Sequence, residues 1–331
     1  MAGEVWILAE QKDHRLKDVS FELLTWGSKL AKIRKTPLCA VVLAGSLSEA
    51  ELQWLAQYGA DKIYFVSHPV FEHFLVEPFA HTLQHLVKSS QPEIFLAGAT
   101  TTGRTVMPYL AILLHTGLTA DCTGLEIEPE TGNLLQIRPA IGGNIMATIK
   151  TPECRPQMAT VRPKSIEVTN LDPARKGEII KPEVPDQAFL SRMKFEKDIP
   201  EGQGKAALDE ADMVVSGGMG MQNPEHLHLL EELADALGAA LGSSRPPVDH
   251  GWQPYVRQVG LSGRTISPAL YIACGISGSV QHLAGIQTAK NIVAINSDPE
   301  APIFQVADFG IVGDVLQVLP VLTRHIKTDL K

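Results

Sequence analysis

Short apolar runs alternate with longer amphipathic segments through the first third of the chain. The strand-like runs cover 5–10, 38–45, 62–67 and 93–98. The segments between them, with the apolar spacing of a helix, cover 18–34, 48–58, 71–88 and 103–115. Ser48 and Glu51 fit a capping box, which supports a helix start at that point. This alternation predicts a doubly wound parallel sheet.

After Gly117 the pattern changes to short β-like runs at 123–128, 134–140, 144–149 and 157–161, interrupted by turn-forming residues at 130–133. We expect these runs to form an antiparallel β appendage. Residues 170–205 are rich in proline and charge, which is typical of a linker. The alternation within 192–199 leaves open a strand that returns to the first sheet.

The second half restarts the strand and helix succession. Strands are expected at 213–218, 270–275 and 292–297, with helices at 224–238, 278–288 and 313–327. A chain of 331 residues favours two domains, since a domain has about 150 residues. We therefore predict an α/β protein of two doubly wound, Rossmann-like domains, an N-terminal one at 1–204 and a C-terminal one at 205–331.

Composition narrows the class of protein. With 44% hydrophobic and 20% charged residues, the chain is typical of a folded globular protein. A net charge of −8 argues against nucleic-acid partners and a basic membrane-binding surface. Glu4 lies where a signal peptide would carry a basic residue, and no apolar run is long enough to span a membrane, so we expect a cytoplasmic protein that is not membrane-embedded. The cysteines are too scattered for a metal cluster or a disulfide framework: Cys39, Cys122, Cys154 and Cys274.

Two glycine-rich turns follow strands of the second half. In the first, Ser216–Gly220, glycines expose amides that suit a phosphate, but the third glycine of the dinucleotide fingerprint is absent and a plain tight turn is the alternative. The second, Gly275–His282, adds the Ser277 hydroxyl and the side chain of Gln281. For His282 a surface or satisfied core histidine remains the alternative to a site residue.

Three further features bear on a binding site. The stretch 243–271 is longer than usual loops, which favours binding or irregular packing of its own over a solvated connection anchored by Trp252. Asn296 ends a strand at the edge where parallel sheets bind ligands. Beyond it lies Asp308, and then Asp314 suits either a ribose hydroxyl or a helix cap. In the first domain, the turn Gly98–Arg104 is a candidate phosphate loop, with a structural helix start and subunit contact as the alternative.

Longer stretches make the chain similar to a known family. SSRPPVDHGW, RQVGLSG, LYIACGISGSVQHLAG and IVAINSDPEAPIFQVADFGIVGD in the second half, with LTADCTGL, RPAIGGN and PQMATVRP in the first, resemble the alpha subunit of the electron transfer flavoproteins. The resemblance spans essentially the whole chain. It implies one FAD, held mainly by the C-terminal domain, and a heterodimer with a beta subunit that holds AMP or a second FAD.

The resemblance also implies a set of FAD-binding residues, no catalytic residues and no metal. The set comprises Ser244, Arg245, Val259, Gly260, Leu261, Ser262, Ser277, Gly278, Ser279, Val280, Gln281, His282, Asn296 and Asp314.

Three members of this set are expected to tune the flavin. A protonated or strongly donating His282 would face flavin N1 and the C2 carbonyl, where charge develops on one-electron reduction. Arg245 would add a permanent positive charge, and the Ser262 hydroxyl would bond flavin N5. The sequence departs from the family at Met219, where many members have Arg, and at Leu261, where Gln is frequent; Ser262 replaces the commoner Thr.

The expected function is electron relay without substrate chemistry of its own. The donors would be flavoprotein dehydrogenases such as the acyl-CoA dehydrogenases of fatty acid oxidation, and the acceptor a quinone oxidoreductase or a ferredoxin-type protein. One alternative is a subunit of an NADH-oxidising complex that bifurcates electrons. Another is a nucleotide-sensing module without redox work.

Overall fold

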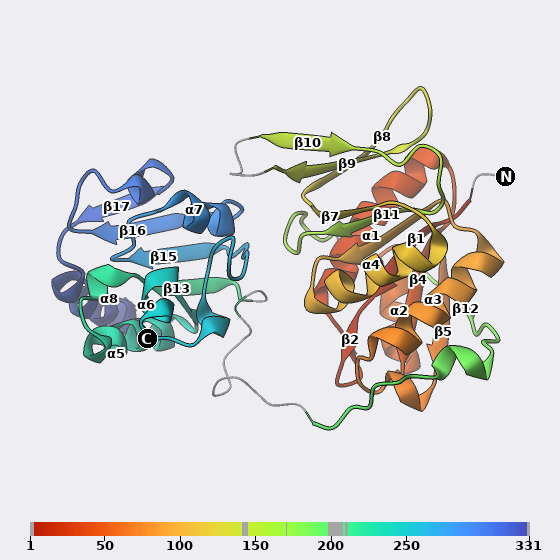
Figure 1. Cartoon of the computed structure of the whole chain (residues 1–331), viewed down its shortest axis with the longest axis horizontal. Helices are drawn as coiled ribbons and strands as arrows, with labels where there is room; N and C mark the ends of the chain where they lie inside the picture. The colour runs from red at the N-terminus through yellow and green to blue at the C-terminus, as the bar shows by residue number, and fades with distance from the viewer. Residues whose placement is uncertain (1–2, 141–144, 170, 198–207, 209–210, 330–331) are drawn as a thin grey trace. The chain divides into compact units, whose positions relative to one another are not determined.

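The computed structural model describes residues 3–140, 145–169, 171–197, 208 and 211–329 (Figure 1). The chain divides into two compact units, Met1–Lys197 and Asp198–Lys331. The expected domain boundary between 204 and 205 lies outside the described residues. Each unit has its own parallel sheet, and the first also has a small antiparallel one. The predicted fold class is therefore confirmed.

The first unit is built on a seven-stranded sheet in the order β12-β5-β4-β1-β6-β11-β7, with all neighbours parallel. Its central strands are buried along their whole length, which explains their unbroken apolar sequences. The strands are β1 (Val5–Ala9), β4 (Leu38–Ala44), β5 (Lys62–Ser67), β6 (Ile94–Gly98), β7 (Leu118–Cys122), β11 (Gln157–Val161) and β12 (Glu178–Ile180).

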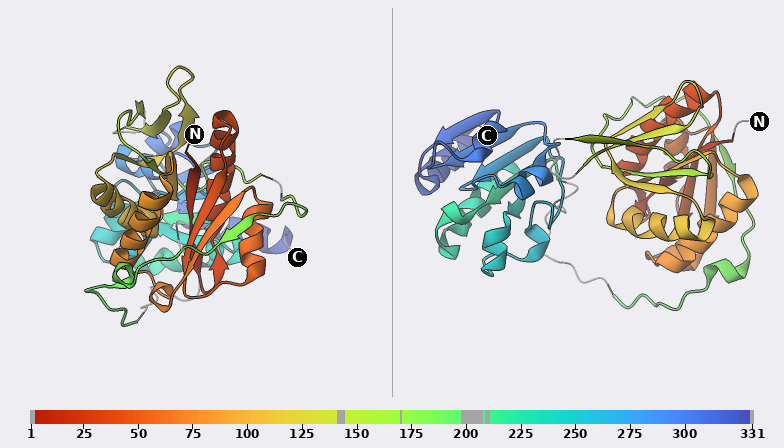
Figure 2. Two further views of the ribbon diagram at one scale, coloured as in Figure 1. Left: turned by 90° about the vertical axis from the view of Figure 1, so that its right-hand side faces the viewer. Right: turned by 45° about the horizontal axis from the view of Figure 1, so that its top comes forward.

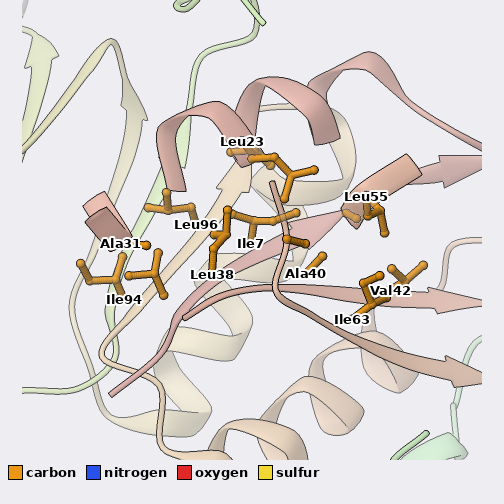
Figure 3. Packing of buried hydrophobic residues seen from close by; sticks show 14 of the residues in the cluster. Ile7, Leu23, Ala31, Leu38, Ala40, Val42, Leu55, Ile63, Ile94 and Leu96 are labelled. Atoms are coloured by element: carbon orange, nitrogen blue, oxygen red, sulfur yellow. The ribbon is translucent and has the colours of Figure 1, made fainter. Parts of the chain in front are cut away.

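Helices cover both faces of this sheet (Figure 2). On one face Leu23 and Leu55 pack over Ile7 and the neighbouring strands (Figure 3), and burial of each such leucine stabilises the fold by about 2 kcal/mol. The predicted cap at Ser48 is confirmed in its first half, since the Ser48 hydroxyl accepts the Glu51 amide at 3.2 Å. The Glu51 carboxylate accepts the Leu16 amide at 2.9 Å, not the Ser48 amide of a full capping box. The helices are α1 (Asp18–Arg34) and α2 (Glu49–Gln57) on this face, with η1 (Pro69–Phe71), α3 (Val76–Ser90) and α4 (Thr101–Leu114) on the other.

The antiparallel appendage is smaller than predicted. It contains β8 (Gly124–Ile127), β9 (Leu134–Pro139) and β10 (Met146–Ile149) in the order β10-β9-β8. The prediction that 157–161 belongs to it is wrong: this run is β11, which lies between β6 and β7 in the parallel sheet. All five residues of β11 are buried, as in a central strand. Residues 141–144, between β9 and β10, lie outside the described part.

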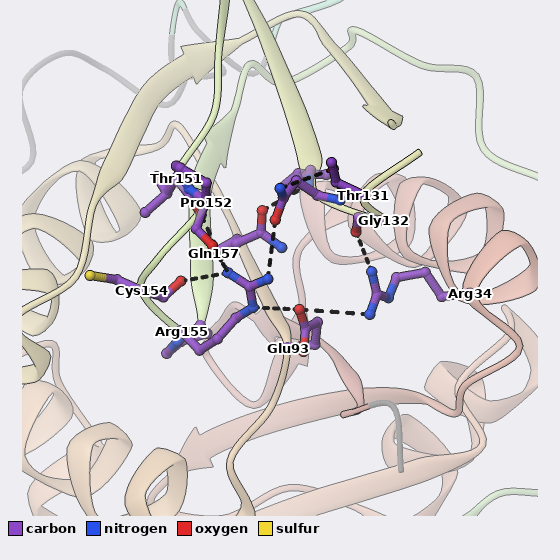
Figure 4. A network of polar contacts seen from close by, with 12 residues as sticks. Arg34, Glu93, Thr131, Gly132, Thr151, Pro152, Cys154, Arg155 and Gln157 are labelled. Atoms are coloured by element: carbon purple, nitrogen blue, oxygen red, sulfur yellow. Dashed lines mark hydrogen bonds and ion pairs between the residues drawn. The ribbon is translucent and has the colours of Figure 1, made fainter. Parts of the chain in front are cut away.

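Polar contacts tie the appendage to the main sheet (Figure 4). The Arg155 guanidinium bonds the Glu93 carboxylate and donates to Asn133 Oδ1 at 3.1 Å. Gln157 Oε1, on β11, accepts the Leu134 amide at 2.8 Å. These contacts hold the start of β9 against the amino ends of β6 and β11.

A further two-stranded hairpin joins β2 (Gln11–Lys12) to β3 (Arg15–Leu16).

The segment expected as a linker lies largely on the first unit. The short strand β12 extends the sheet beside β5, and η2 (Asp186–Phe189) follows it. The Phe189 ring stacks on His68 with ring centroids 4.0 Å apart, and Arg192 donates to the Glu77 carboxylate from its backbone amide and its Nε at 2.7 Å each. No strand occurs within 192–197, so the returning strand is β12 instead; 198–199 lie outside the described residues.

The second unit is a five-stranded parallel sheet in the order β14-β13-β15-β16-β17. Its edge strands β14 and β17 are four residues each and escaped the sequence analysis. The strands are β13 (Met213–Gly217), β14 (Ala240–Ser243), β15 (Leu270–Cys274), β16 (Ile292–Asn296) and β17 (Phe309–Val312). The helices are η3 (Met219–Met221), η4 (Pro224–His226), α5 (Leu227–Leu237), α6 (Arg245–Asp249), η5 (Tyr255–Arg257), α7 (Val280–Ile286), η6 (Pro302–Gln305) and α8 (Val315–Asp329).

Candidate functional site

Four parallel strands of the second unit end at one cavity of about 400 Å³. β13 and β15 run into the two glycine turns, β14 leads to α6, and β16 ends at the cavity. This is the carboxyl edge, where open parallel sheets bind ligands. The lining residues are Met219, Gly220, Ser244, Arg245, Pro246, Val259, Gly260, Ser262, Gly275, Ile276, Ser277, Gly278, Ser279, Gln281, His282 and Asn296.

The two glycine turns contact each other through their backbones. The Gly220 amide donates to the Gly275 carbonyl at 2.9 Å, and a Cβ on Gly218 would lie 2.2 Å from that same oxygen. No side chain fits between two turns at this separation. The first turn is therefore a tight turn in its own geometry, and it also forms one wall of the cavity through Met219 and Gly220.

The second turn presents hydroxyl groups to the cavity. Gly278 has φ +88°, and a Cβ there would lie 2.4 Å from the Ile303 amide nitrogen, so the turn requires glycine. The Ser277 carbonyl accepts that amide at 2.9 Å, which fixes the turn against η6. Within the described part of the chain, the hydroxyls of Ser244, Ser277 and Ser279 have no hydrogen-bond partner, and all three residues line the cavity.

The Ser262 hydroxyl is oriented by a buried glutamine. Gln258 Nε2 donates to Ser262 Oγ at 2.9 Å, so the hydroxyl oxygen accepts and its proton remains to be donated. The Ser262 carbonyl accepts a hydrogen bond from the Tyr255 hydroxyl at 2.8 Å, and the Val259 amide donates to the Ser243 carbonyl at 2.9 Å. This wall of the cavity is thus held at both ends.

Arg245 provides the positive charge of the site. Its Nε donates to Asp249 Oδ2 at 3.0 Å, one helical turn further along α6. The side chain is 67% exposed, so the guanidinium lies on the open side of the cavity and is available to a ligand. An arginine keeps its charge at every physiological pH.

His282 is bonded to the protein through both ring nitrogens. Its Nδ1 lies 3.1 Å from the Val259 carbonyl oxygen and its Nε2 lies 2.8 Å from the Tyr271 hydroxyl. The residue is 4% exposed, and burial lowers its pKa to about 4. The imidazole is therefore neutral at neutral pH. The ring thus has the bonds of a satisfied core histidine while it also lines the cavity, and its expected role beside the flavin stays a prediction.

The structure brings together all but three of the residues expected from the sequence. Leu261 and Val280 are 56% and 59% exposed and do not line the cavity. Asp314 is also absent from the lining; its Oδ1 accepts the Leu316 amide at 2.9 Å, so the helix-capping alternative is the one seen, at the start of α8. Asp308 likewise accepts the Ile292 amide, at 2.7 Å.

Some lining residues were missed by the sequence analysis as binding residues. Met219 and Gly220 belong to the first turn, and Gly275 and Ile276 to the second. Their sequence signal is their place in a turn already singled out, and Met219 also departs from the arginine that many family members have there. Pro246 follows Arg245 at the start of α6, a helix that was not predicted within the long stretch 243–271.

The candidate phosphate turn of the first unit is a helix start. Thr100 Oγ1 accepts the Gly103 amide at 3.1 Å as the cap of α4, and donates to Glu10 Oε1 at 2.6 Å. Arg104 lies 3.4 Å from Asp121. These bonds occupy the Thr100 hydroxyl and the Gly103 amide, in line with the structural alternative; the predicted subunit contact stays a prediction.

In the part of the chain that the structure describes, no group of His, Cys, Asp and Glu side chains could hold a metal ion. The four cysteines are free thiols, and only Cys154 is not buried. None of the described helices has the length and apolar character needed to cross a membrane.

Comparison with known proteins places the two units in one family. Residues 5–187 match the electron transfer flavoprotein domain, and residues 207–287 match the electron transfer flavoprotein FAD-binding domain. The chain is 45% identical over 324 residues to the electron transfer flavoprotein subunit alpha of Thermoanaerobacterium thermosaccharolyticum, covering 98% of each chain. It is 42% identical to the same subunit of Megasphaera elsdenii, covering 98% of this chain and 96% of that one. It is also 38% identical to the lactate dehydrogenase (NAD(+),ferredoxin) subunit LctC of Acetobacterium woodii, covering 98% of this chain and 77% of that one.

Proposed function

Because the chain belongs to the family of electron transfer flavoprotein alpha subunits, we propose that its cavity at the carboxyl edge of the second sheet holds FAD in a heterodimeric electron carrier. The observation that carries the proposal is a coincidence of position. Most of the cavity lining comes from the segment that matches the FAD-binding domain.

The chemistry of the lining fits this cofactor. Glycine turns that leave no room for side chains let a pyrophosphate approach backbone amides. The unpartnered hydroxyls of Ser244, Ser277 and Ser279 can donate to phosphate oxygens, and Arg245 supplies positive charge. The volume of about 400 Å³ lies within the usual range of ligand sites.

The residues of this chain would then have distinct tasks. When bound, FAD supplies the electron-transfer chemistry that none of the lining side chains possesses. Arg245 stabilises negative charge in the cavity, and Ser262 directs its free hydroxyl proton inward. Asn296 is held by its own donation to the Ile276 carbonyl at 2.9 Å, which keeps that end of the cavity rigid. Val259, Gly260, Gly278 and Gln281 shape the walls.

As for partners, we propose a beta subunit that binds AMP, a flavoprotein dehydrogenase as donor, and a quinone oxidoreductase or ferredoxin-type protein as acceptor. The family membership supports the beta subunit. In this carrier role the chain has no substrate chemistry of its own.

A second candidate is a subunit of an NADH-oxidising complex that bifurcates electrons. The resemblance to LctC, whose name includes NAD(+) and ferredoxin, favours it. Counting cofactors separates the two functions. A simple carrier has one FAD and one AMP per heterodimer and does not bleach with NADH, whereas a bifurcating complex has two FAD and bleaches with NADH.

The site itself is tested by exchanging single arginines in the purified heterodimer. Arg245→Gln should lower FAD retention, because it removes the charge beside the cavity. The matched control is Arg257→Gln, since Arg257 bonds Gln253 and does not line the cavity. Equal FAD retention in both variants would contradict the placement. A complex that binds nucleotide without flavin absorbance would instead support a nucleotide-sensing module.

A further inference from the structure

Tyr271, the second residue of β15, lies behind the cavity wall. It is completely buried, it does not line the cavity, and its hydroxyl lies 2.8 Å from His282 Nε2. It lies within a stretch that carries the family resemblance, but it is not among the residues expected to bind FAD. Among the described residues, the hydrogen bond that joins its hydroxyl to the cavity lining goes to the imidazole of His282.

The directions of the hydrogen bonds follow from the chemistry of the partners. A backbone carbonyl only accepts, so His282 Nδ1, at 3.1 Å from the Val259 oxygen, carries a proton. Because burial keeps the ring neutral, Nε2 has a lone pair, and the Tyr271 hydroxyl must donate to it. The neighbouring Ser216 hydroxyl is a competing acceptor, since it is buried without a hydrogen-bond partner among the described residues and is near enough to affect the Tyr271 pKa. Donation to Ser216 would leave Nε2 unpaired in the core, at a cost of about 1–3 kcal/mol.

We propose that Tyr271 is a positioning residue, which holds His282 in the Nδ1–H tautomer so that the ring fixes the Val259 carbonyl and the cavity wall from Val259 to Ser262. Two backbone contacts further restrict the position of the Val259–Ser262 wall. The Leu261 amide donates to the Gln281 carbonyl at 2.9 Å, and a Cβ on Gly285 would lie 2.5 Å from the Gly260 Cα. His282 thus acts on the cavity through the backbone that it holds, and Tyr271 acts through His282.

The consequence for the cofactor rests on the proposed function. If FAD occupies the cavity, the position of the Ser262 hydroxyl depends on the Val259–Ser262 wall and hence on Tyr271. Removing the phenol oxygen should change the flavin midpoint potential without emptying the cavity, because Tyr271 has no place in its lining.

The test compares Tyr271→Phe, His282→Asn and the double variant in the purified two-chain complex. Histidine-ring ¹⁵N NMR should show a neutral Nδ1–H ring for His282 in the wild type, identified by its absence in His282→Asn. In Tyr271→Phe the Nε2 resonance should move and a second tautomer should appear. The flavin midpoint potential should shift in Tyr271→Phe, yet Tyr271→Phe should add no shift in the His282→Asn background. Tyr58→Phe, which removes a hydroxyl from the first unit, should change neither signal.

Two results would overturn the proposal. One is an Nε2–H or doubly protonated His282 in the wild type at neutral pH, and the other is additive potential shifts, which would leave Tyr271 a packing role alone. The ring tautomer is read whether or not flavin is bound. A colourless complex with the Nδ1–H ring would therefore contradict the proposed function and leave the positioning role standing.

Discussion

At the scale of single residues, burial decides the charge of His282. Burial deprives the protonated imidazole of hydration, and this destabilises the charged form more than its hydrogen bond to the Val259 carbonyl stabilises it. The pKa of His282 therefore falls from 6.5 to about 4. Between pH 6.5 and pH 4, His282 is therefore protonated in the unfolded chain but neutral in the folded one. The contribution of His282 to stability is complete above pH 6.5 and decreases as the pH falls toward 4.

We expect acidification across this window to cost the wild type roughly 3 kcal/mol more than it costs His282→Asn. The measurement is urea unfolding of both proteins at a series of pH values, with the difference between them taken at each pH. Parallel stability curves would show that His282 takes up its proton over the same pH range in the folded and the unfolded chain, and that the burial argument fails.

A second residue prediction concerns the hydroxyl that points into the cavity. Ser262→Ala removes a donor whose proton is left free by the bond from Gln258. A donor of this kind favours the reduced, more negative flavin by about 1 kcal/mol, so the midpoint potential should fall in Ser262→Ala. Ser262→Thr keeps the hydroxyl and should retain the wild-type potential within error. Redox titration measures both, and a lower potential in the threonine variant as well would assign the effect to packing.

At the scale of elements, the glycine turn after β15 is the part that tolerates least change. Gly278→Ala would place a methyl group 2.4 Å from the Ile303 amide at a positive φ, and we expect a loss of about 3 kcal/mol with reduced FAD retention. Gly238 also has a positive φ, +65°, but has nothing within 4 Å, so Gly238→Ala is the matched control and should cost about 1 kcal/mol with FAD retained. Unfolding curves and flavin absorbance test the pair. Equal losses would show that strain in φ, and not the close approach, governs the turn.

The elements also show what sequence patterns can and cannot predict. The central strands and the helices of the first unit were predictable because strand and helix periods alternate cleanly. The neighbours of β11 could not be predicted, because the sequence of the run 157–161 is equally compatible with parallel and antiparallel neighbours. β12 has three residues inside a proline-rich segment, so nothing local separates it from a linker.

For the candidate site, the sequence predicts the place of the cavity but not the roles of some of its residues. Glycine turns and hydroxyls at strand ends indicated the cavity, because parallel strands bring their carboxyl ends together. The orientation of His282 depends on Tyr271 and Val259, which contact it only in the folded chain. The capping role of Asp314 likewise depends on where α8 begins. Such roles are set by tertiary contacts that no local pattern encodes.

At the scale of the whole molecule, the two units differ in the family domain that they match and in the candidate site that they contain. The first matches the electron transfer flavoprotein domain; its glycine turn at 98–104 is a capped helix start. The second matches the FAD-binding domain and contains the cavity with unpartnered hydroxyls. We therefore expect the cofactor of this chain to depend mainly on residues of the second unit.

The most direct measurement is the flavin content of the purified heterodimer, made with the wild-type chain and with Gly278→Ala. The wild type should be yellow, with one FAD assigned to this chain, and the variant should lose that FAD while Gly238→Ala keeps it. A wild-type complex that is colourless and stays so after incubation with FAD would contradict the account, as would a Gly278→Ala complex with full FAD content.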